Sequence, residues 1–361
     1  METNTNLCIK GSSSFIGEVT DIEEWAKNNQ IPNIKRPGQS LNGEDIQKIL
    51  GIKGKSWNPS LFSNPDIVEQ TAKSALNMAC MSPSDIDAFI LVTCTPFEVM
   101  FDRDAMYFMS KLQLNDHIIP IQLNAGCAGF ARAFNLASRL KAKNTLILTY
   151  HLMSPVSDNK KETYFNNDRH PFHKHLWMTP ALFSDGIGAV ILSQSDQKSF
   201  SFYSRDSMSR ATNGEKFDSP LVHYLGGGVK KIDGYKDTDL QCFAMEGEEI
   251  KKYYMEGMSF NHQSFLNHNP HYLKNVKKKY IHQASPNLVN AYIENFIKNN
   301  NVSRDLVRTQ VEELGNIVTP STIKLLDEDI RSGKLTNGDE ICFSVVGAGP
   351  ERGGFITRVS I

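Results

Sequence analysis

The chain has 361 residues, a formal net charge of −1 at pH 7 and six cysteines scattered without paired spacing. The near-neutral charge predicts no nucleic-acid partner, no apolar stretch reaches the roughly 18 residues of a membrane span, and the first residues lack the basic start and apolar run of a signal peptide. The cysteine spacing argues against a zinc site and a disulfide framework, so we expect a cytoplasmic protein that holds no metal.

Strands alternate with helices through the first part of the chain. The expected elements, in order, are a strand at 6–16, mostly helical residues at 20–50, a basic loop at 51–57, a helix at 64–79, a strand at 86–95, a helix at 104–112, and strands at 118–123 and 144–150. The run from Phe89 to Thr93 is apolar enough for a central parallel strand that is covered on both faces. This alternation predicts a layered α/β fold.

The segment Asn124–Phe130 places a cysteine between a strand and a helix. Apolar residues at three- and four-residue steps after the segment predict the helix. Gly126 and Gly129 allow a tight turn and let a substrate approach the backbone. A helix N-terminus stabilises a thiolate, which is the form of cysteine that attacks acyl groups. We therefore interpret Cys127 as a nucleophile; a small buried hydrophobic residue is the alternative.

The middle of the chain carries two weaker signals. Residues 154–180 are polar and read as irregular, with His170, His173 and His175 close together. These histidines suggest a metal site, but no carboxylate or cysteine pairing supports one, so a polar surface loop is the better interpretation. Residues 196–240 contain three consecutive glycines, 226–228, without the Lys-Ser or Lys-Thr that follows in a phosphate-binding loop, so a flexible loop is expected there.

The second half of the chain returns to alternating elements. The expected elements are an Asp-Gly turn that leads into a strand at 182–192, a helix at 245–265, a strand at 280–285 that runs into a helix at Pro286, a helix ending near Ile330, and strands at 341–346 and 354–359. The strand at 182–192 is expected to close a first half, residues 1–193, and residues 194–361 form the second half.

Four segments together resemble the ketoacyl-ACP synthase III family of the thiolase superfamily. Ala125–Phe130 looks like the family's nucleophile loop, Phe183–Ala189 like its Gly-Asp-Gly-x-Gly-Ala segment, and His282-Gln283-Ala284 like its Pro-His-Gln-Ala motif. Gly315-Asn316, followed by Leu326-Asp327-Glu328 and by Gly347-Ala348-Gly349, resembles the asparagine motif and the C-terminal end. The four segments occur in the family order at family-like separations.

The resemblance implies a five-layered α/β fold of two topologically similar halves, and a homodimer whose seam lies near the nucleophile. The first half, 1–193, would carry Cys127, and the second half, 194–361, the histidine and asparagine motifs. Phe101 falls where the family places a residue that crosses the seam to shape the acyl pocket. Phe97 and Met100 belong to the same loop. Ordinary core positions are the alternative for these three residues.

The resemblance also implies the chemistry of an acyltransferase. Cys127 would take an acyl group from a thioester of CoA or an acyl carrier protein, and a malonyl-type thioester would then lose carbon dioxide and attack the acyl group. Backbone N–H groups of Cys127 and of the Gly347–Gly349 turn, at Ala348, would form the oxyanion hole. His282 and Asn316 would stabilise the enolate as hydrogen-bond donors. No cofactor is implied.

The sequence departs from the family pattern at three places. Ile281 replaces the proline before the histidine, and Ile317, Val318 and Pro320 replace small residues after Asn316. Asp45–Leu50 stands where typical members have a tryptophan and an arginine that hold the CoA adenine. The last departure favours a ketosynthase of polyketide or other secondary metabolism over the first step of fatty-acid synthesis. Retention of Asn316 favours condensation, whereas the altered residues after it favour an acyltransferase that forms an ester or amide.

Two other functions remain open. An acyltransferase of the same fold would form an ester or amide from the acyl-enzyme, with less need of Asn316. A non-catalytic partner subunit is the third hypothesis, although such a subunit would be expected to lose Cys127.

Overall fold

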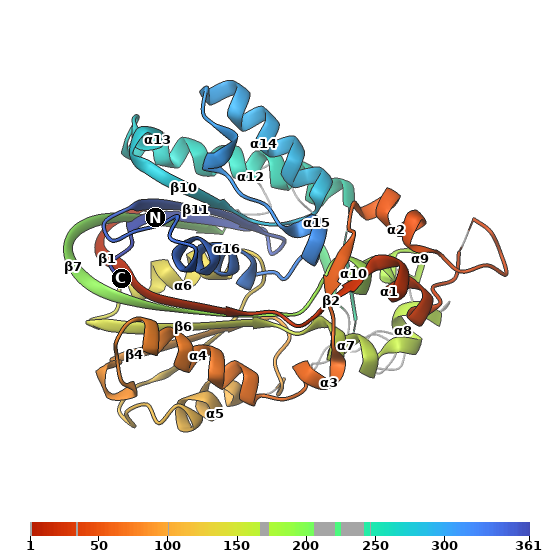
Figure 1. Cartoon of the computed structure of the whole chain (residues 1–361), viewed down its shortest axis with the longest axis horizontal. Coiled ribbons are helices and arrows are strands. Elements are labelled where there is room, and N and C mark those ends of the chain that lie inside the picture. Colours follow the sequence, from red (N-terminus) through yellow and green to blue (C-terminus); the bar gives the residue numbers. More distant parts are fainter. Residues whose placement is uncertain are drawn as a thin grey trace.

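A computed structural model describes residues 2–33, 35–99, 101–166, 173–205, 221–224, 242–245 and 247–361. Its main elements form five layers, in which helices cover both outer faces of two sheets and further helices lie between the sheets (Figure 1). The layered α/β fold expected from the sequence is therefore confirmed.

The first sheet has three parallel strands at its centre and edge. These are β4 (Ala88–Thr93), β5 (Pro120–Asn124) and β6 (Asn144–His151), and β4 lies between the other two. Because the strands are parallel, their carboxyl ends meet at one edge of the sheet. The run from Phe89 to Thr93 lies inside β4, as expected, and every residue of β4 is buried.

The second sheet is built from the C-terminal part of the chain. It contains β10 (Val276–Ile281), β11 (Glu340–Gly347) and β12 (Glu351–Arg358). Strands β10 and β11 are parallel, and β12 runs antiparallel to β11.

Two long strands belong to both sheets. The first part of β7 (Gly186–Arg205) pairs with β6 and the second part pairs with β12. Strand β1 (Glu2–Phe15) follows β7 along both parts, with register shifts after Thr5 and Ile9. Figure 1 shows β7 bending from one sheet to the other at the left of the molecule. Because β7 runs through residue 193, the division into halves at that residue stays a prediction.

Helices occupy the three remaining layers (Figure 1). One outer face carries α4 (Asp66–Met78) and α5 (Arg103–Lys111), the space between the sheets holds α6 (Gly129–Ala137) and α16 (Pro320–Arg331), and the other outer face carries α12 (Gly247–His268), α13 (Tyr272–Asn275) and α14 (Pro286–Asn300). The starts of α4 and α14 agree with the sequence, since Pro65 precedes α4 and Pro286 is the first residue of α14.

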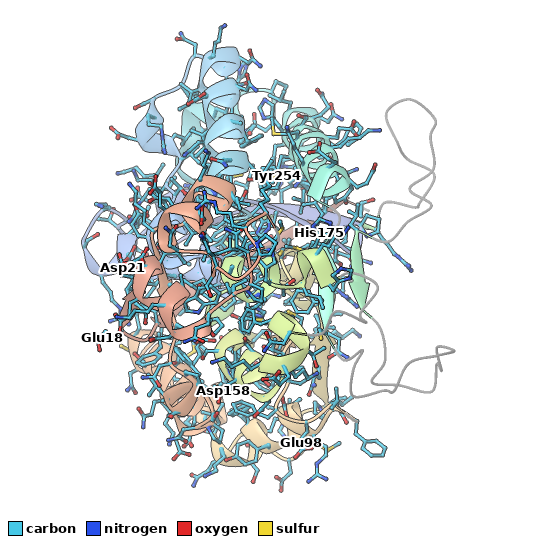
Figure 2. The ribbon with its side chains drawn as sticks, turned by 90° about the vertical axis from the view of Figure 1, so that its right-hand side faces the viewer. Glu18, Asp21, Glu98, Asp158, His175 and Tyr254 are labelled. Atoms are coloured by element: carbon cyan, nitrogen blue, oxygen red, sulfur yellow. The ribbon has the colours of Figure 1, made fainter. Side chains whose placement is uncertain are left out.

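Shorter elements gather at the end of the molecule shown in Figure 2, where Asp21, Asp158 and His175 lie. They are β2 (Val19–Asp21), α1 (Ile22–Asn29), α2 (Gly43–Leu50), β3 (Gly54–Ser56), α3 (Pro59–Phe62), α7 (Met153–Asn159), α8 (Lys161–Asn166), α9 (His173–Leu176), α10 (Met178–Leu182) and α15 (Val311–Leu314). Two 3-10 turns, Pro83–Asp85 and Arg304–Leu306, and the strand pair β8 (Val222–Tyr224) and β9 (Phe243–Met245) complete the described elements.

Two sequence expectations about this region were wrong. Residues 154–180, expected to be irregular, contain helices α7 to α10. Tyr164 and Leu176 of these helices, and Trp177 between α9 and α10, enter an apolar cluster with Trp25. The residues after 196, expected to be a polar loop, first continue β7 as far as Arg205. His170 and the glycines 226–228 lie outside the described residues.

The core follows the two-residue period of the strands. Ile90 and Val92 of β4 face the helices between the sheets, whereas Phe89 and Leu91 face α4 and α5. A strand that is buried on both faces has no side exposed to water. Its sequence is therefore continuously apolar and does not alternate between apolar and polar residues. Among the helices of the described residues, none combines the length and the apolar character that a bilayer crossing requires.

One carboxylate attaches α16 to β1. Asp327 accepts hydrogen bonds from the Ser12 hydroxyl (3.0 Å) and from the N–H and hydroxyl of Ser14 (3.0 and 2.9 Å), and it pairs with Arg331 at 3.1 Å. Hydrogen bonds to a buried charged group are among the stronger ones in proteins. They fix the position of α16, the helix that follows the asparagine motif.

Candidate active site

The predicted nucleophile lies in a turn between β5 and α6. The Gly129 N–H donates to the Gly126 carbonyl at 2.8 Å, which closes the turn around Cys127. A Cβ on Gly129 would stand 2.5 Å from Val92 Cγ1 and 2.8 Å from Thr319 Oγ1, so only glycine fits there. Cys127 itself is partly exposed and packs against an apolar cluster.

The pKa of the Cys127 thiol is shifted upward, whereas a position at a helix N-terminus would shift it downward. Burial raises the pKa of this thiol, and the nearby Cys94 and Glu351 raise it further. The dipole of a nine-residue helix does not outweigh this loss of solvation. Cys127 is therefore a thiol in the free chain.

The predicted histidine follows the last residue of β10. The His282 N–H donates to the Ser344 carbonyl of β11 at 3.1 Å, and the His282 carbonyl accepts from the Tyr254 hydroxyl at 2.9 Å. Burial lowers the pKa of His282 to about 3. The imidazole is therefore neutral near pH 7, with one ring nitrogen that donates and one that accepts.

The predicted asparagine lies directly beside the histidine motif. Asn316 is buried, and its Nδ2 donates to the carbonyl of Ala284, two residues after His282, at 3.0 Å. Its Oδ1 accepts from the Val318 N–H at 2.8 Å. Nδ2 carries two hydrogens, so one N–H of the amide is left for a further partner.

A strained residue holds the asparagine side chain. Val318 has a backbone φ of 57°, in the left-handed region where β-branched residues are outliers. Such strain is typical of functional sites, where the surrounding structure enforces it. The next residue, Thr319, donates its hydroxyl to the Gly126 carbonyl, so the asparagine loop contacts the nucleophile loop directly.

The third motif near the nucleophile is the turn Gly347–Gly349. A Cβ on Gly347 would lie 3.1 Å from both the N and the Cβ of Ala128, the residue after Cys127. The turn therefore packs on the peptide that follows the nucleophile, and Ala348 is half-buried beside it. Cys127, His282, Asn316 and Ala348 thus come from loops that touch one another or touch a shared neighbour.

The Asp-Gly segment, Phe183–Ala189, contacts the asparagine loop through its backbone. The Ser184 N–H donates to the Asn316 carbonyl at 3.0 Å, and the Asp185 carboxylate accepts from the Ser154 N–H at 2.7 Å and the Asn58 N–H at 3.3 Å. Burial raises the pKa of Asp185 to about 6. The segment therefore acts through backbone contacts to the asparagine loop.

Comparisons with known proteins give one consistent family. The family described as "3-Oxoacyl-[acyl-carrier-protein (ACP)] synthase III C terminal" matches residues 267–359. Beta-ketoacyl-[acyl-carrier-protein] synthase III of Aquifex aeolicus is 26% identical over 80% of this chain and 82% of its own length, and that of Microcystis aeruginosa is 27% identical over 89% and 94%. The crystal structure of 3-oxoacyl-(acyl carrier protein) synthase III from Pseudomonas aeruginosa has a TM-score of 0.75 and 19% identity, and covers 99% of both chains.

The chain is a ketoacyl-ACP synthase III-like condensing enzyme of the thiolase superfamily. The enzyme is an acyltransferase, as its sequence predicted.

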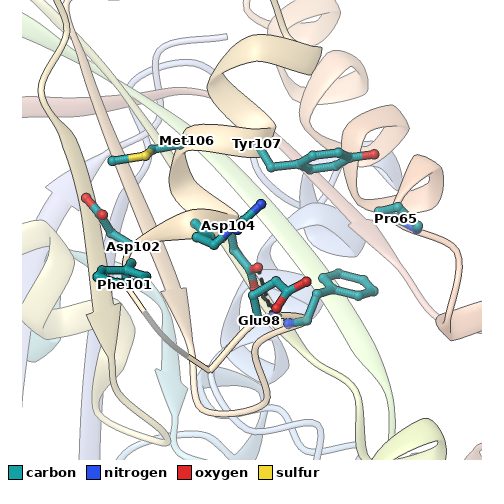
Figure 3. A pocket seen from close by; sticks show the side chains of 9 residues that line it. Pro65, Glu98, Phe101, Asp102, Asp104, Met106 and Tyr107 are labelled. Carbon is teal, nitrogen blue, oxygen red and sulfur yellow. Dashed lines mark hydrogen bonds between the residues drawn. The ribbon is translucent and has the colours of Figure 1, made fainter.

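Two of the three predicted acyl-pocket residues of this synthase III-like enzyme, Phe97 and Phe101, lie within the described residues. Phe97 and Phe101 line an open groove of about 730 Å³ along the start of α5, whose lining includes none of Cys127, His282 and Asn316 (Figure 3). Met100 lies outside the described residues. The roles of Phe97, Met100 and Phe101 therefore stay predictions.

The loop that carries Phe97 is held by a buried carboxylate. Asp104 accepts from the N–H groups of Phe97 at 2.8 Å and Glu98 at 3.1 Å (Figure 3). It also accepts from the Tyr150 hydroxyl. The side chain of Phe101 is 81% exposed, and its backbone φ is 62°. Asp104 thus anchors the loop, and the loop exposes the Phe101 ring to solvent.

Three residues near the nucleophile were not singled out from the sequence of this enzyme. Cys94 follows β4, His151 ends β6, and Glu351 begins β12. The only signal in the sequence was that polar residues end two apolar strands parallel to β5. No group of three or more metal-binding side chains is found among the described residues, and His173 and His175 are exposed there.

Proposed function

We propose that the enzyme forms a carbon–carbon bond between an acyl group carried on Cys127 and a malonyl-type thioester. Two contacts carry the proposal. The Thr319 hydroxyl bonds the Gly126 carbonyl, and the Asn316 amide bonds the Ala284 carbonyl, so that the nucleophile, asparagine and histidine loops meet. Homology to beta-ketoacyl-ACP synthase III relatives supports the same reaction.

The first half-reaction would load the nucleophile. The Cys127 sulfur attacks the carbonyl carbon of an acyl thioester on CoA or an acyl carrier protein, and the thiol of the donor leaves with the proton. The tetrahedral oxyanion needs donors that already point at it. The N–H groups of Cys127 and Ala348 are the candidates, because the Gly347 turn packs on the peptide after the nucleophile.

The second half-reaction would use the neutral His282 and the remaining N–H of Asn316. A malonyl-type thioester loses carbon dioxide, and the electron pair left behind forms an enolate whose oxygen accepts from these donors. The enolate carbon then attacks the acyl carbonyl, and the Cys127 thiolate leaves. A neutral imidazole suits this role because burial holds its pKa at about 3.

An ester- or amide-forming acyltransferase is the second candidate. The observation that favours it is the asparagine side chain, whose Oδ1 and Nδ2 are both bonded within the protein. An asparagine used only to shape its loop would look the same.

We also propose that two copies of the chain pair along β5. This strand is hydrogen-bonded to β4 alone among the described strands, and its side chains are half-buried or exposed. Large apolar side chains are exposed beside it, notably Val99 (71%), Phe101 (81%) and Ile119 (78%). An uncovered apolar patch next to an open strand edge is typical of an interface.

The six cysteines are free, which supports a reducing cytoplasm.

The reaction is tested by intact-protein mass spectrometry with a panel of acyl thioesters, followed by malonyl thioester and measurement of carbon dioxide release. We expect a mass increase that Cys127→Ala abolishes and that Cys80→Ala, which removes an exposed thiol at the end of α4, leaves intact. Asn316→Ala should still load but release carbon dioxide on the order of 100-fold more slowly, since one enolate donor is lost.

The outcomes separate the candidates. Discharge of the acyl-enzyme by malonyl thioester, with carbon dioxide and a β-ketoacyl product, supports condensation. Discharge only by an amine or alcohol supports the ester- or amide-forming reaction. No Cys127-dependent mass increase with any donor would contradict both.

A further inference from the structure

A second cysteine and a buried histidine lie at the same sheet edge as the nucleophile. Cys94 directly follows β4, His151 is the last residue of β6, and the loop of Cys127 follows β5. These three strands are parallel neighbours, and ligands bind at the carboxyl ends of such strands in α/β folds. The mechanism above uses neither Cys94 nor His151.

The His151 side chain has one polar atom with a partner and one without. Its Nδ1 lies 3.4 Å from the Cys94 sulfur, and its ring packs edge-on against Phe183 at 5.5 Å. The residue is 1% exposed, and its Nε2 is buried with no hydrogen-bond partner among the residues that the structure describes. A buried polar group without a partner destabilises a protein by about 1–3 kcal/mol, so such a group calls for an explanation.

The pair lies against the nucleophile loop. A Cβ on Gly126 would stand 3.9 Å from the Cys94 sulfur and 3.6 Å from Val318 Cγ1. Phe183, which packs on the His151 ring, forms a β-bridge with Asn316. The pair therefore lies between the nucleophile loop and the asparagine loop, with His151 buried and Cys94 exposed.

The side chains packed against the pair are mostly apolar, and the buried Lys55, which donates to the Phe183 carbonyl at 2.7 Å, is the charged group that acts on His151. Phe183 and Val318 belong to the apolar cluster on which Cys127 packs, and Phe243 contacts Phe183 at 5.6 Å. A mostly apolar wall with a few polar groups is the usual construction of a site for a mostly apolar ligand that carries one polar group.

We propose that His151 is a specificity-determining residue, whose Nε2 hydrogen-bonds an oxygen on the acyl group carried by Cys127. The preferred donor is then an acyl thioester with a hydroxyl or keto oxygen at carbon 3. Cys94 lies beside Gly126, the residue before Cys127, and His151 lies one side chain beyond Cys94. This separation from the Cys127 sulfur is the reason for placing the oxygen at carbon 3. This inference rests on the loading of Cys127 proposed above.

The protonation of the pair agrees with this role. Burial lowers the pKa of His151 to about 3, and the charge of Lys55 acts in the same direction. Loss of hydration at the Cys94 sulfur raises the pKa of this thiol to about 12, although the residue as a whole is exposed. Both groups are therefore neutral near pH 7. With the Cys94 thiol donating to Nδ1, Nε2 carries the hydrogen and donates to the acyl oxygen. In the other tautomer Nε2 accepts, and then only a hydroxyl can bind.

The test compares the rates at which Cys127 is loaded by butanoyl, 3-hydroxybutanoyl and 3-oxobutanoyl thioesters, measured by intact-protein mass. We expect the wild type to prefer an oxygenated donor by on the order of tenfold, because a site built to hydrogen-bond an oxygen discriminates against an analogue without it. In His151→Phe the preference should fall to about one, with butanoyl loading retained. His151→Gln, which keeps a side-chain donor, should restore part of the preference.

Two further variants test the partner of the imidazole. Cys94→Ser keeps a hydrogen-bonding group at Nδ1 and should retain the preference, whereas Cys94→Ala should weaken it. A 3-oxobutanoyl donor that loads as well as the 3-hydroxybutanoyl donor indicates that Nε2 carries the hydrogen.

Equal loading of all three donors by the wild type would overturn the proposal and would mean that Nε2 binds only water. An unchanged preference in His151→Phe would overturn it as well. In both cases the loaded butanoyl group would still support the proposed function. A wild type that none of the three donors loads would contradict this inference and the donor chemistry on which it rests.

Discussion

The charge that opposes thiolate formation comes from a single residue of β12. After burial and Cys94, Glu351 is the further group that raises the pKa of the Cys127 thiol. The Glu351 carboxylate accepts from the Tyr203 hydroxyl and lies 4.0 Å from Arg132, so its charge is held in place. A thiol kept protonated in this way is protected from unselective reagents, and it attacks a bound thioester only once it has lost its proton.

We expect Glu351→Gln to lower the pKa of Cys127. Glutamine keeps an acceptor for Tyr203 but removes the negative charge, so the thiolate becomes less unfavourable. Alkylation of Cys127 by iodoacetamide, followed by peptide mass spectrometry, should become faster at pH 8 by roughly threefold to tenfold. Glu340→Gln is the control, because Glu340 pairs with Arg358 at the opposite end of β11. An unchanged or slower alkylation of Cys127 would contradict the expectation.

The positions of single residues were predictable only where chemistry is contiguous in sequence. Cys127 and His282 each stand in a short motif, and the asparagine loop contacts both loops that carry them. His151 and Cys94 are 57 residues apart and are joined only because β4 and β6 are neighbours, which a single sequence does not show. For the same reason Glu351 gave no signal.

At the scale of elements, periodicity predicted the long helices and the buried strands and missed the rest. Helices α7 to α10 have four to seven residues, too few for a helical period, and they are stable because their apolar residues enter a shared cluster. Strand β7 was predicted to end near residue 193 because Gln194–Lys198, where it crosses between the sheets, are mostly exposed and polar. The length of β7 depends on strands β1 and β12, which lie far away in sequence.

The edge of β5 gives an element-level prediction. Aspartate at both Phe101 and Ile119 would place charges in the exposed apolar patch beside β5, and burying such charges in an interface is costly. We expect the double variant to sediment as a monomer of 40.5 kDa under conditions in which the wild type sediments at twice that mass. Ile49→Asp, on α2, is the control, since Ile49 is also an exposed apolar residue (44%). A double variant with the mass of the wild type would exclude this patch from the interface.

At the scale of the whole molecule, the site requires several ionisable groups to be buried without solvent. Lys55 is fully buried, donates to the carbonyls of Ala181 and Phe183 at 2.7 Å each, and lies about 5 Å from two tryptophan rings. Burial lowers its pKa well below the usual range. Each such group binds protons differently in the folded and unfolded states, so the stability of the fold depends on pH.

We expect the free energy of unfolding to fall as the pH is lowered from 7.5 to 5. His151 and His282 have pKa values of about 3 in the folded chain, mainly because they are buried, and ordinary values on unfolding. Their stabilising contribution is full above the unfolded pKa and is lost as the pH falls toward the folded one, by about 2 kcal/mol per histidine at pH 5. Asp185 opposes this trend by about 1 kcal/mol, because burial raises its pKa to about 6 and the folded state then takes up a proton first. Urea denaturation at fixed protein concentration across this range measures the net loss, which should be about 2 kcal/mol smaller in His151→Phe than in the wild type. A stability that stays constant or rises toward pH 5 would show that the two histidines are protonated in the folded enzyme. Both the condensation and the acyl preference depend on neutral imidazole donors, so both proposals would then lose their basis.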